Sequence, residues 1–163
     1  MSRTSSQMAD TAVATAIRST YTVAFRLLGD EAEAGAATLA AVEAVSRELA
    51  DGAPEPAALA KLRRAAVEEA GARLRSRGLQ SRVAREPHRR AATEGAEDAR
   101  STVDAVLALP DALRAVFVLR AVERLDDDTV ARLLGLDPSD VGELWVMAVV
   151  ALRGSEAGGE NER

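Results

Sequence analysis

Cysteine is absent from the 163-residue sequence, and histidine occurs once, as His88. Without thiols, disulfides and thiolate chemistry are excluded, and a reducing cytoplasm is the expected location. A catalytic base or a metal site also lacks its usual ligands, because the single imidazole lies in a polar stretch where we expect it to be solvated. We therefore expect no enzyme and no cofactor.

Aromatic residues are scarce, with one Trp, one Tyr and two Phe. Alanine, leucine, glutamate and arginine dominate instead, which favours helices over sheets. The longest uncharged apolar run, Leu144 to Leu152, is too short to span a bilayer, and residues 1–10 lack the apolar stretch of a signal peptide. We expect an all-α cytoplasmic protein.

Charge is distributed unevenly along the chain. The net charge is −5, yet residues 61–90 hold ten basic and three acidic residues, a net +7, so that the remainder carries −12. A basic block of this kind forms either a nucleic-acid patch or a solvated helix face, and the charge alone does not decide between them.

Apolar residues at steps of three and four predict helices over 10–29, 31–50 and 57–77. Gly29 and Asp30 are expected to end the first helix and form a turn, and residues 51–56, with two prolines and a glycine, should not be helical. We expect a first domain over 10–78 with a three-helix bundle.

The stretch 79–100 changes from basic to acidic and has no apolar periodicity, which predicts a linker. A second domain is expected over 101–154, followed by a disordered tail, 155–163. Its predicted helices cover Val103–Leu109, Asp111–Arg124, a short helix from Asp126 or Asp127 to Leu134, and Ser139–Arg153. Three adjacent acids at 126–128 could suggest a cation site, but helix capping explains them better.

Two predicted helices joined at Leu134-Gly135 have the pattern of a helix-turn-helix, which is weakly specific by itself. The surrounding residues strengthen it. Leu109 to Arg120 begins Leu-Pro and continues as an amphipathic helix ending Leu-Arg, and 125–153 follows without a gap. This region resembles sigma region four of the extracytoplasmic-function group of bacterial sigma factors.

The first half resembles sigma region two of the same family, through Phe25 to Asp30, Glu33-Ala34 and the helix 59–77. The resemblance covers both regions in the family's order and implies a transcription factor whose partners are RNA polymerase core, an anti-sigma factor and promoter DNA. The helix 59–77 resembles the one that contacts the downstream promoter element. We expect its basic face, made of Lys61, Arg64, Arg73, Arg75 and Arg77, to be able to hold a phosphate backbone without reading the sequence.

The last helix departs from the family at the positions that read DNA. Six positions that are basic or histidine in the family are here Gly142, Leu144, Val146, Met147, Val149 and Val150. Residues 101–154 carry a net charge of −4. Because binding to phosphates is largely electrostatic, we expect little DNA binding by this half. Either this apolar helix is more deeply buried than in the family, or it binds protein, through Leu144, Trp145, Val146, Met147, Val149 and Val150.

The region-two resemblance also departs from its pattern. Gly35-Ala36 stands where the family has an acidic pair that docks on the polymerase, and Ala65 lies near the family's promoter-reading Asn. No aromatic residue occurs between Leu27 and Val116, although bases flipped from a duplex need stacking partners.

These observations leave three hypotheses. The first is a sigma-like regulator that acts through protein contacts, capturing an anti-sigma factor or polymerase, or pairing with itself through the last helix. The second is a working sigma factor that reads promoters mainly through region two. The third is a structural or interaction protein that retains only the fold.

Overall fold

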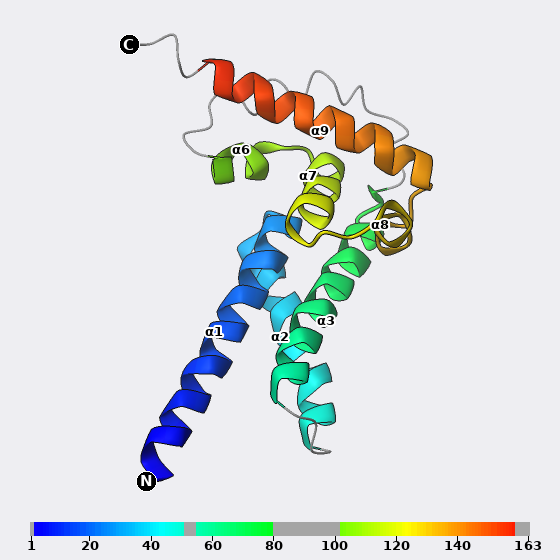
Figure 1. Ribbon diagram of the computed structural model, residues 1–163. Helices are drawn as coiled ribbons and strands as arrows, with labels where there is room; N and C mark the ends of the chain where they lie inside the picture. The colour runs from blue at the N-terminus through cyan, green and yellow to red at the C-terminus, as the bar shows by residue number, and fades with distance from the viewer. Residues whose placement is uncertain (1, 51–54, 80–101, 159–163) are drawn as a thin grey trace. The chain divides into compact units, whose positions relative to one another are not determined.

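The computed structural model describes residues 2–50, 55–79 and 102–158, and all regular secondary structure within them is helical (Figure 1). The elements are α1 (Ser2–Leu28), α2 (Glu31–Ala50), α3 (Glu55–Ser76), α6 (Thr102–Ala108), α7 (Asp111–Phe117), the π-helical turn η1 (Val118–Val122), α8 (Asp127–Leu134) and α9 (Pro138–Gly158). The predicted all-α class is confirmed. Within these residues, no helix is long and apolar enough to cross a membrane.

The chain forms two compact units, Met1–Ala70 and Gly71–Arg163. The boundary lies inside α3, whereas the sequence placed the end of the first domain at residue 78. The last turns of α3 belong to the second unit because Gly71 and Arg75 contact α8 there. Leu79, assigned to the linker by its sequence, is 1% exposed and buried. His88 and the rest of the predicted linker lie outside the described residues.

The first unit is built around the pair α1 and α2, joined by the turn predicted at Gly29-Asp30. Gly29 has φ 68°, a left-handed conformation that favours glycine, and its N–H donates to the Phe25 carbonyl at 2.8 Å. The Asp30 carboxylate accepts from the Glu33 N–H at 2.8 Å and caps α2. The turn is therefore fixed by local capping.

Alanine supplies much of the core of this unit. One cluster brings Ala41 and Val45 of α2 against Leu62 and Ala66 of α3, with Ala16 of α1 packed beside them. Such small side chains let helices approach closely but bury little apolar area each. Arginine and glutamate cover the exposed side of α3, where Arg64 and Glu68 form an ion pair at 3.0 Å.

Several helix ends differ from the predictions. Helix α1 begins at Ser2 instead of residue 10, and α3 begins at Glu55, so the prediction that residues 51–56 are not helical is wrong for its last two residues. Pro56 fits there because the first turn of a helix does not need its N–H. Helix α9 continues to Gly158, which overturns the predicted tail over 155–158; residues 159–163 lie outside the described part.

The core of the second unit lies between α7 and α9. Leu113 and Val116 of α7 are fully buried, as are Val141 and Ala148 of α9. In Figure 1, α9 (orange to red) runs over α6 and α7. Residues 111–124 were predicted as one α-helix. The α-helix instead changes at Val118 into the wider π-helical turn η1, and the backbone leaves the helical conformation at Arg124, whose φ of 56° is left-handed.

Asp126 caps α8 through its side chain, which accepts from the Thr129 backbone N–H at 2.8 Å and from the Thr129 hydroxyl at 3.0 Å. The backbone hydrogen bond, which favours the ionised carboxylate, is the main cause that lowers the pKa of Asp126 below its ordinary value. A lowered pKa in the folded state means that the cap stabilises the fold above about pH 4 and is lost as the pH falls further.

We therefore expect the melting temperature of the second unit to fall on acidification below about pH 4, and to fall less in Asp126→Asn, whose amide oxygen still accepts the hydrogen bond but does not titrate. Thermal melts of both proteins from pH 7 to pH 3, followed by Trp fluorescence, measure this difference. Equal pH dependence in the two proteins would contradict the assignment.

Candidate functional site

Helices α8 and α9 form the helix-turn-helix that the sequence predicts. Gly135 ends α8 with φ 67°, and the Leu136 N–H donates to the Ala131 carbonyl at 2.9 Å. Helix α9 starts directly afterwards, at Pro138, a position that needs no backbone N–H. The turn therefore spans only residues 135–137, and it fixes α9 as the second helix of the motif.

One face of α9 belongs to the core of the second unit. Val141, Leu144, Ala148 and Ala151 recur at steps of three and four and are all at most 6% exposed. Leu144 is therefore a core residue, and its assignment to an exposed interaction surface is corrected. The sequence could not separate it from its neighbours because residues 144–150 are apolar on nearly every side.

Trp145 lies at the edge of this core and is half-buried. Its ring stacks on Phe117 of α7 with a centroid separation of 5.7 Å and an interplanar angle of 13°. The Arg120 guanidinium carbon lies 4.6 Å from the Trp145 ring centroid, a cation–π contact. The sole tryptophan is thus engaged by side chains of its own unit, which weakens its assignment as an anchor for a partner.

Arg120 also joins α8 to this cluster. Its Nε lies 2.8 Å from Asp127 Oδ1, an ion pair without the alignment of a hydrogen bond. One guanidinium therefore contacts the first turn of α8 and the ring on α9. We infer that Arg120 sets the position of both helices of the helix-turn-helix.

Arg120→Gln is expected to lower the free energy of unfolding of the second unit by about 1 kcal/mol, because it removes the cation–π contact and the ion pair at a partly exposed site. Urea titration followed by emission of the sole tryptophan measures it. Arg132→Gln is the matched control, since the Arg132 guanidinium is exposed and lies 3.4 Å from the Thr129 hydroxyl. Equal stability of the two variants would contradict the role given to Arg120.

The opposite face of α9 is exposed and carries little charge. Val146 and Val150 are 59% and 64% exposed. Glu143 and Arg153 are exposed on the same side, and Met147 and Val149 are half-buried beside them. Five of the six predicted protein-interaction residues therefore reach the surface at least in part, since Val146 and Val150 are exposed and Trp145, Met147 and Val149 are half-buried; Leu144 alone is buried. The solvent face of this helix has an acid at its start and no basic residue before Arg153.

The basic residues of α3 do not form one face. Lys61, Arg64 and Arg75 are exposed, whereas Arg73 and Arg77 are partly buried and lie on the side of α3 that carries Leu62 and Ala66. The expected five-residue basic face is therefore corrected. The three exposed residues also fall in different units, since Arg75 follows the boundary at Ala70.

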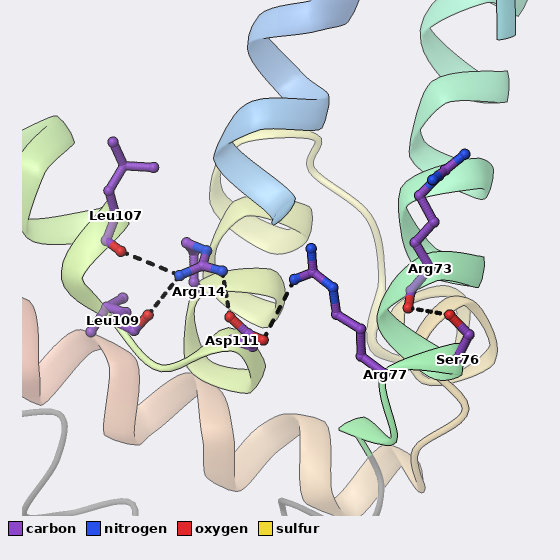
Figure 2. Close-up of polar contacts among 7 residues, drawn as sticks. All are labelled: Arg73, Ser76, Arg77, Leu107, Leu109, Asp111 and Arg114. Carbon is purple, nitrogen blue, oxygen red and sulfur yellow. Dashed lines mark hydrogen bonds and ion pairs between the residues drawn. The ribbon is translucent and has the colours of Figure 1, made fainter. Parts of the chain in front are cut away.

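Arg75 and Arg77 each have a partner in the second unit. Arg75 Nη1 donates to the carbonyl of Leu133, in the last turn of α8. Arg77 Nη1 lies 3.7 Å from Asp111 Oδ2 of α7 (Figure 2). Gly71 lies against the same carbonyl, and a Cβ added there would meet the Leu133 oxygen at 2.9 Å. These contacts hold the end of α3 to the helix-turn-helix.

A polar cluster at the start of α7 was missed by sequence reasoning. Arg114 is 6% exposed and donates to the carbonyls of Leu107 at 3.2 Å and Leu109 at 2.9 Å, and its Nη2 lies 2.5 Å from Asp111 Oδ1 (Figure 2). The Asp-x-x-Arg spacing after a proline is a local signal for the ion pair. Nothing in that spacing indicates that the guanidinium is buried.

No group of three or more histidine, cysteine or acidic side chains is placed to hold a metal ion in the part of the chain that the structure describes. Asp126 caps α8 and Asp127 pairs with Arg120, which gives two of the three adjacent acids a structural role.

The chain was compared with protein-family models, curated proteins and solved structures. No family model, no curated protein and no solved structure matches the chain.

Proposed function

We propose that this protein is a sigma-factor-like transcription regulator that acts through protein contacts, with little reading of DNA by its helix-turn-helix. The observation that carries the proposal is the solvent face of α9. It keeps the position of a recognition helix, directly after a tight turn, but presents Val146 and Val150 where a DNA reader needs donors and positive charge.

Electrostatics support this conclusion. A helix that enters the major groove is surrounded by phosphates, and affinity grows with each phosphate that a Lys or Arg neutralises. Glu143 and Asp140 place negative charge in the first half of α9, and Arg153 is the sole basic residue of its described side chains. Burying two exposed valines against a protein releases water from apolar surface, whereas placing them near phosphates brings no charge compensation.

A working sigma factor that reads promoters through region two is the second candidate. Lys61 and Arg64 favour it, because both are exposed on α3 and able to approach a phosphate backbone. The candidate is weaker than its sequence suggests, since Arg75 and Arg77 have structural partners in the second unit.

Affinity capture from the native cytoplasm with the full chain as bait tests the proposal. We expect polymerase core subunits or an anti-sigma protein to be retained, and to be lost with the bait Val146→Glu/Val150→Glu, whose substitutions lie on exposed positions. Retention of these proteins by both baits would show that they bind a surface other than the exposed face of α9. Capture of no transcription protein would refute the proposed function.

Promoter-specific transcription by the purified chain with core polymerase, abolished by Lys61→Gln/Arg64→Gln, would favour the second candidate instead. Absence of initiation on genomic templates would eliminate that candidate.

A further inference from the structure

The exposed face of α9 carries a pattern of charged and apolar residues that is complementary to a second copy of the same face. After its first turn, where Pro138 and Ser139 are also exposed, the outward positions of α9 are Glu143, Val146, Val150 and Arg153. They are separated by steps of three, four and three residues, so that they form one stripe along the helix. The two valines lie at the centre, with an acid at one end and a base at the other. All four are exposed in the structure.

This stripe is symmetric about Ala148, which lies on the buried face. Val146 and Val150 are each two positions from Ala148, and Glu143 and Arg153 are each five positions from it. When two copies of α9 pack antiparallel about a two-fold axis at that level, Val146 of one copy meets Val150 of the other. Glu143 then meets Arg153 of the other copy, and the symmetry repeats each contact.

We propose that the occupant of this face is a second copy of the chain, paired antiparallel through α9. Charge complementarity selects the direction. A parallel pair would place Glu143 against Glu143 and Arg153 against Arg153, two like-charge contacts, whereas the antiparallel pair converts both into opposite-charge contacts. The inference rests on the proposed function and deepens it, by naming a second copy as what covers the exposed valines when no polymerase or anti-sigma protein does.

A single helix pair is a small interface, so the dimer should be weak, with a Kd on the order of 10 to 100 µM. Sedimentation velocity of the purified full chain over this concentration range is the measurement. We expect the wild-type chain to shift from monomer to dimer, and Val146→Glu to remain monomeric with unchanged far-ultraviolet circular dichroism. The position is 59% exposed, which allows the substitution without unfolding.

Charge exchange tests the register. Glu143→Arg places only positive charge at the two ends of the stripe, and Arg153→Glu places only negative charge there. Each variant alone should dimerise roughly 30-fold more weakly than the wild type, because two attractive ion pairs become two repulsive ones. An equimolar mixture of the two variants should dimerise again, since every pair then joins opposite charges. The double variant Glu143→Arg/Arg153→Glu should likewise restore the wild-type affinity.

The inference is overturned if the wild-type chain is monomeric throughout this range, or if the mixture associates no better than either variant alone. These outcomes are separate from the test of the proposed function. A monomer that captures polymerase or an anti-sigma protein refutes only the dimer, whereas a dimer that captures no transcription protein refutes only the proposed function.

Discussion

Arg114→Met is expected to destabilise the second unit by about 3 kcal/mol. The guanidinium is 6% exposed, and it donates to two carbonyls that the end of α6 leaves without helical partners before Pro110. Met keeps an unbranched apolar stem but none of the donors. The buried carbonyl of Leu109 and the partly buried carbonyl of Leu107 then both lose this donor.

The Asp111 carboxylate adds to the loss, because it loses the Arg114 guanidinium 2.5 Å from its Oδ1, whereas Arg77 lies farther away, 3.7 Å from its Oδ2 (Figure 2). Urea unfolding followed by Trp145 fluorescence measures the change. Arg64→Met is the matched control: its side chain is 80% exposed and pairs with Glu68 within one helix, and we expect a change below about 0.5 kcal/mol. Similar losses in the two variants would show that the Arg114 cluster does not hold α6 to α7.

Gly71→Ala is expected to destabilise the second unit by about 2 kcal/mol, although alanine is the better helix former. A Cβ at this position would lie 2.9 Å from the Leu133 carbonyl oxygen and 3.6 Å from its carbon. Both atoms are backbone, so relief requires α3 and α8 to separate, which also strains the hydrogen bond from Arg75 to that oxygen. The clash outweighs the gain in helix propensity, which is about 1 kcal/mol.

Gly35→Ala and Gly142→Ala are the controls, since a Cβ at either glycine meets nothing within 4 Å. We expect each to stabilise its unit by about 0.5 to 1 kcal/mol, through helix propensity alone. Gly71→Ala should therefore lower the melting temperature and the two controls should raise it, which thermal melts at neutral pH measure. Stabilisation by all three substitutions would show that α3 does not approach α8 as closely as the structure has it.

Local capping made several helix ends predictable from the sequence. Gly29 and Gly135 end their helices in left-handed conformations, and Asp126 begins α8 with a side chain that accepts from Thr129. Each of these features depends on residues within four positions of one another, so a short stretch of sequence contains all the information needed.

Long-range partners were not predictable in the same way. Arg75 and the Leu133 carbonyl that accepts from it are 58 positions apart, and no local pattern distinguishes a solvated arginine from one that caps a distant helix. Val118 to Val122 follows helical periodicity in sequence, yet the chain widens there into a π-turn. On α9, residues 144–150 are apolar on nearly every side, so their sequence does not indicate which side of the helix is buried. Only the packing against α7 shows that Leu144 is buried and Val146 is exposed.

The division inside α3 has a related cause. The sequence shows one continuous helix followed by a polar stretch, which places a boundary at the end of the helix. The contacts of Gly71, Arg75 and Arg77 with α7 and α8 instead attach its last turns to the second unit. Arg75 and Arg77, which the sequence places in a nucleic-acid-binding face, therefore stabilise the second unit.

The central claim is that α9 is no DNA-reading helix, and fluorescence anisotropy of a labelled DNA duplex with the full chain tests it most directly. At about 0.15 M salt and protein concentrations up to about 10 µM, we predict no binding. At lower salt, weak binding should disappear in Lys61→Gln/Arg64→Gln and remain in Val150→Glu. Binding that persists at 0.15 M salt, is abolished by Val150→Glu and is unaffected by Lys61→Gln/Arg64→Gln would show that α9 reads DNA and contradict the account.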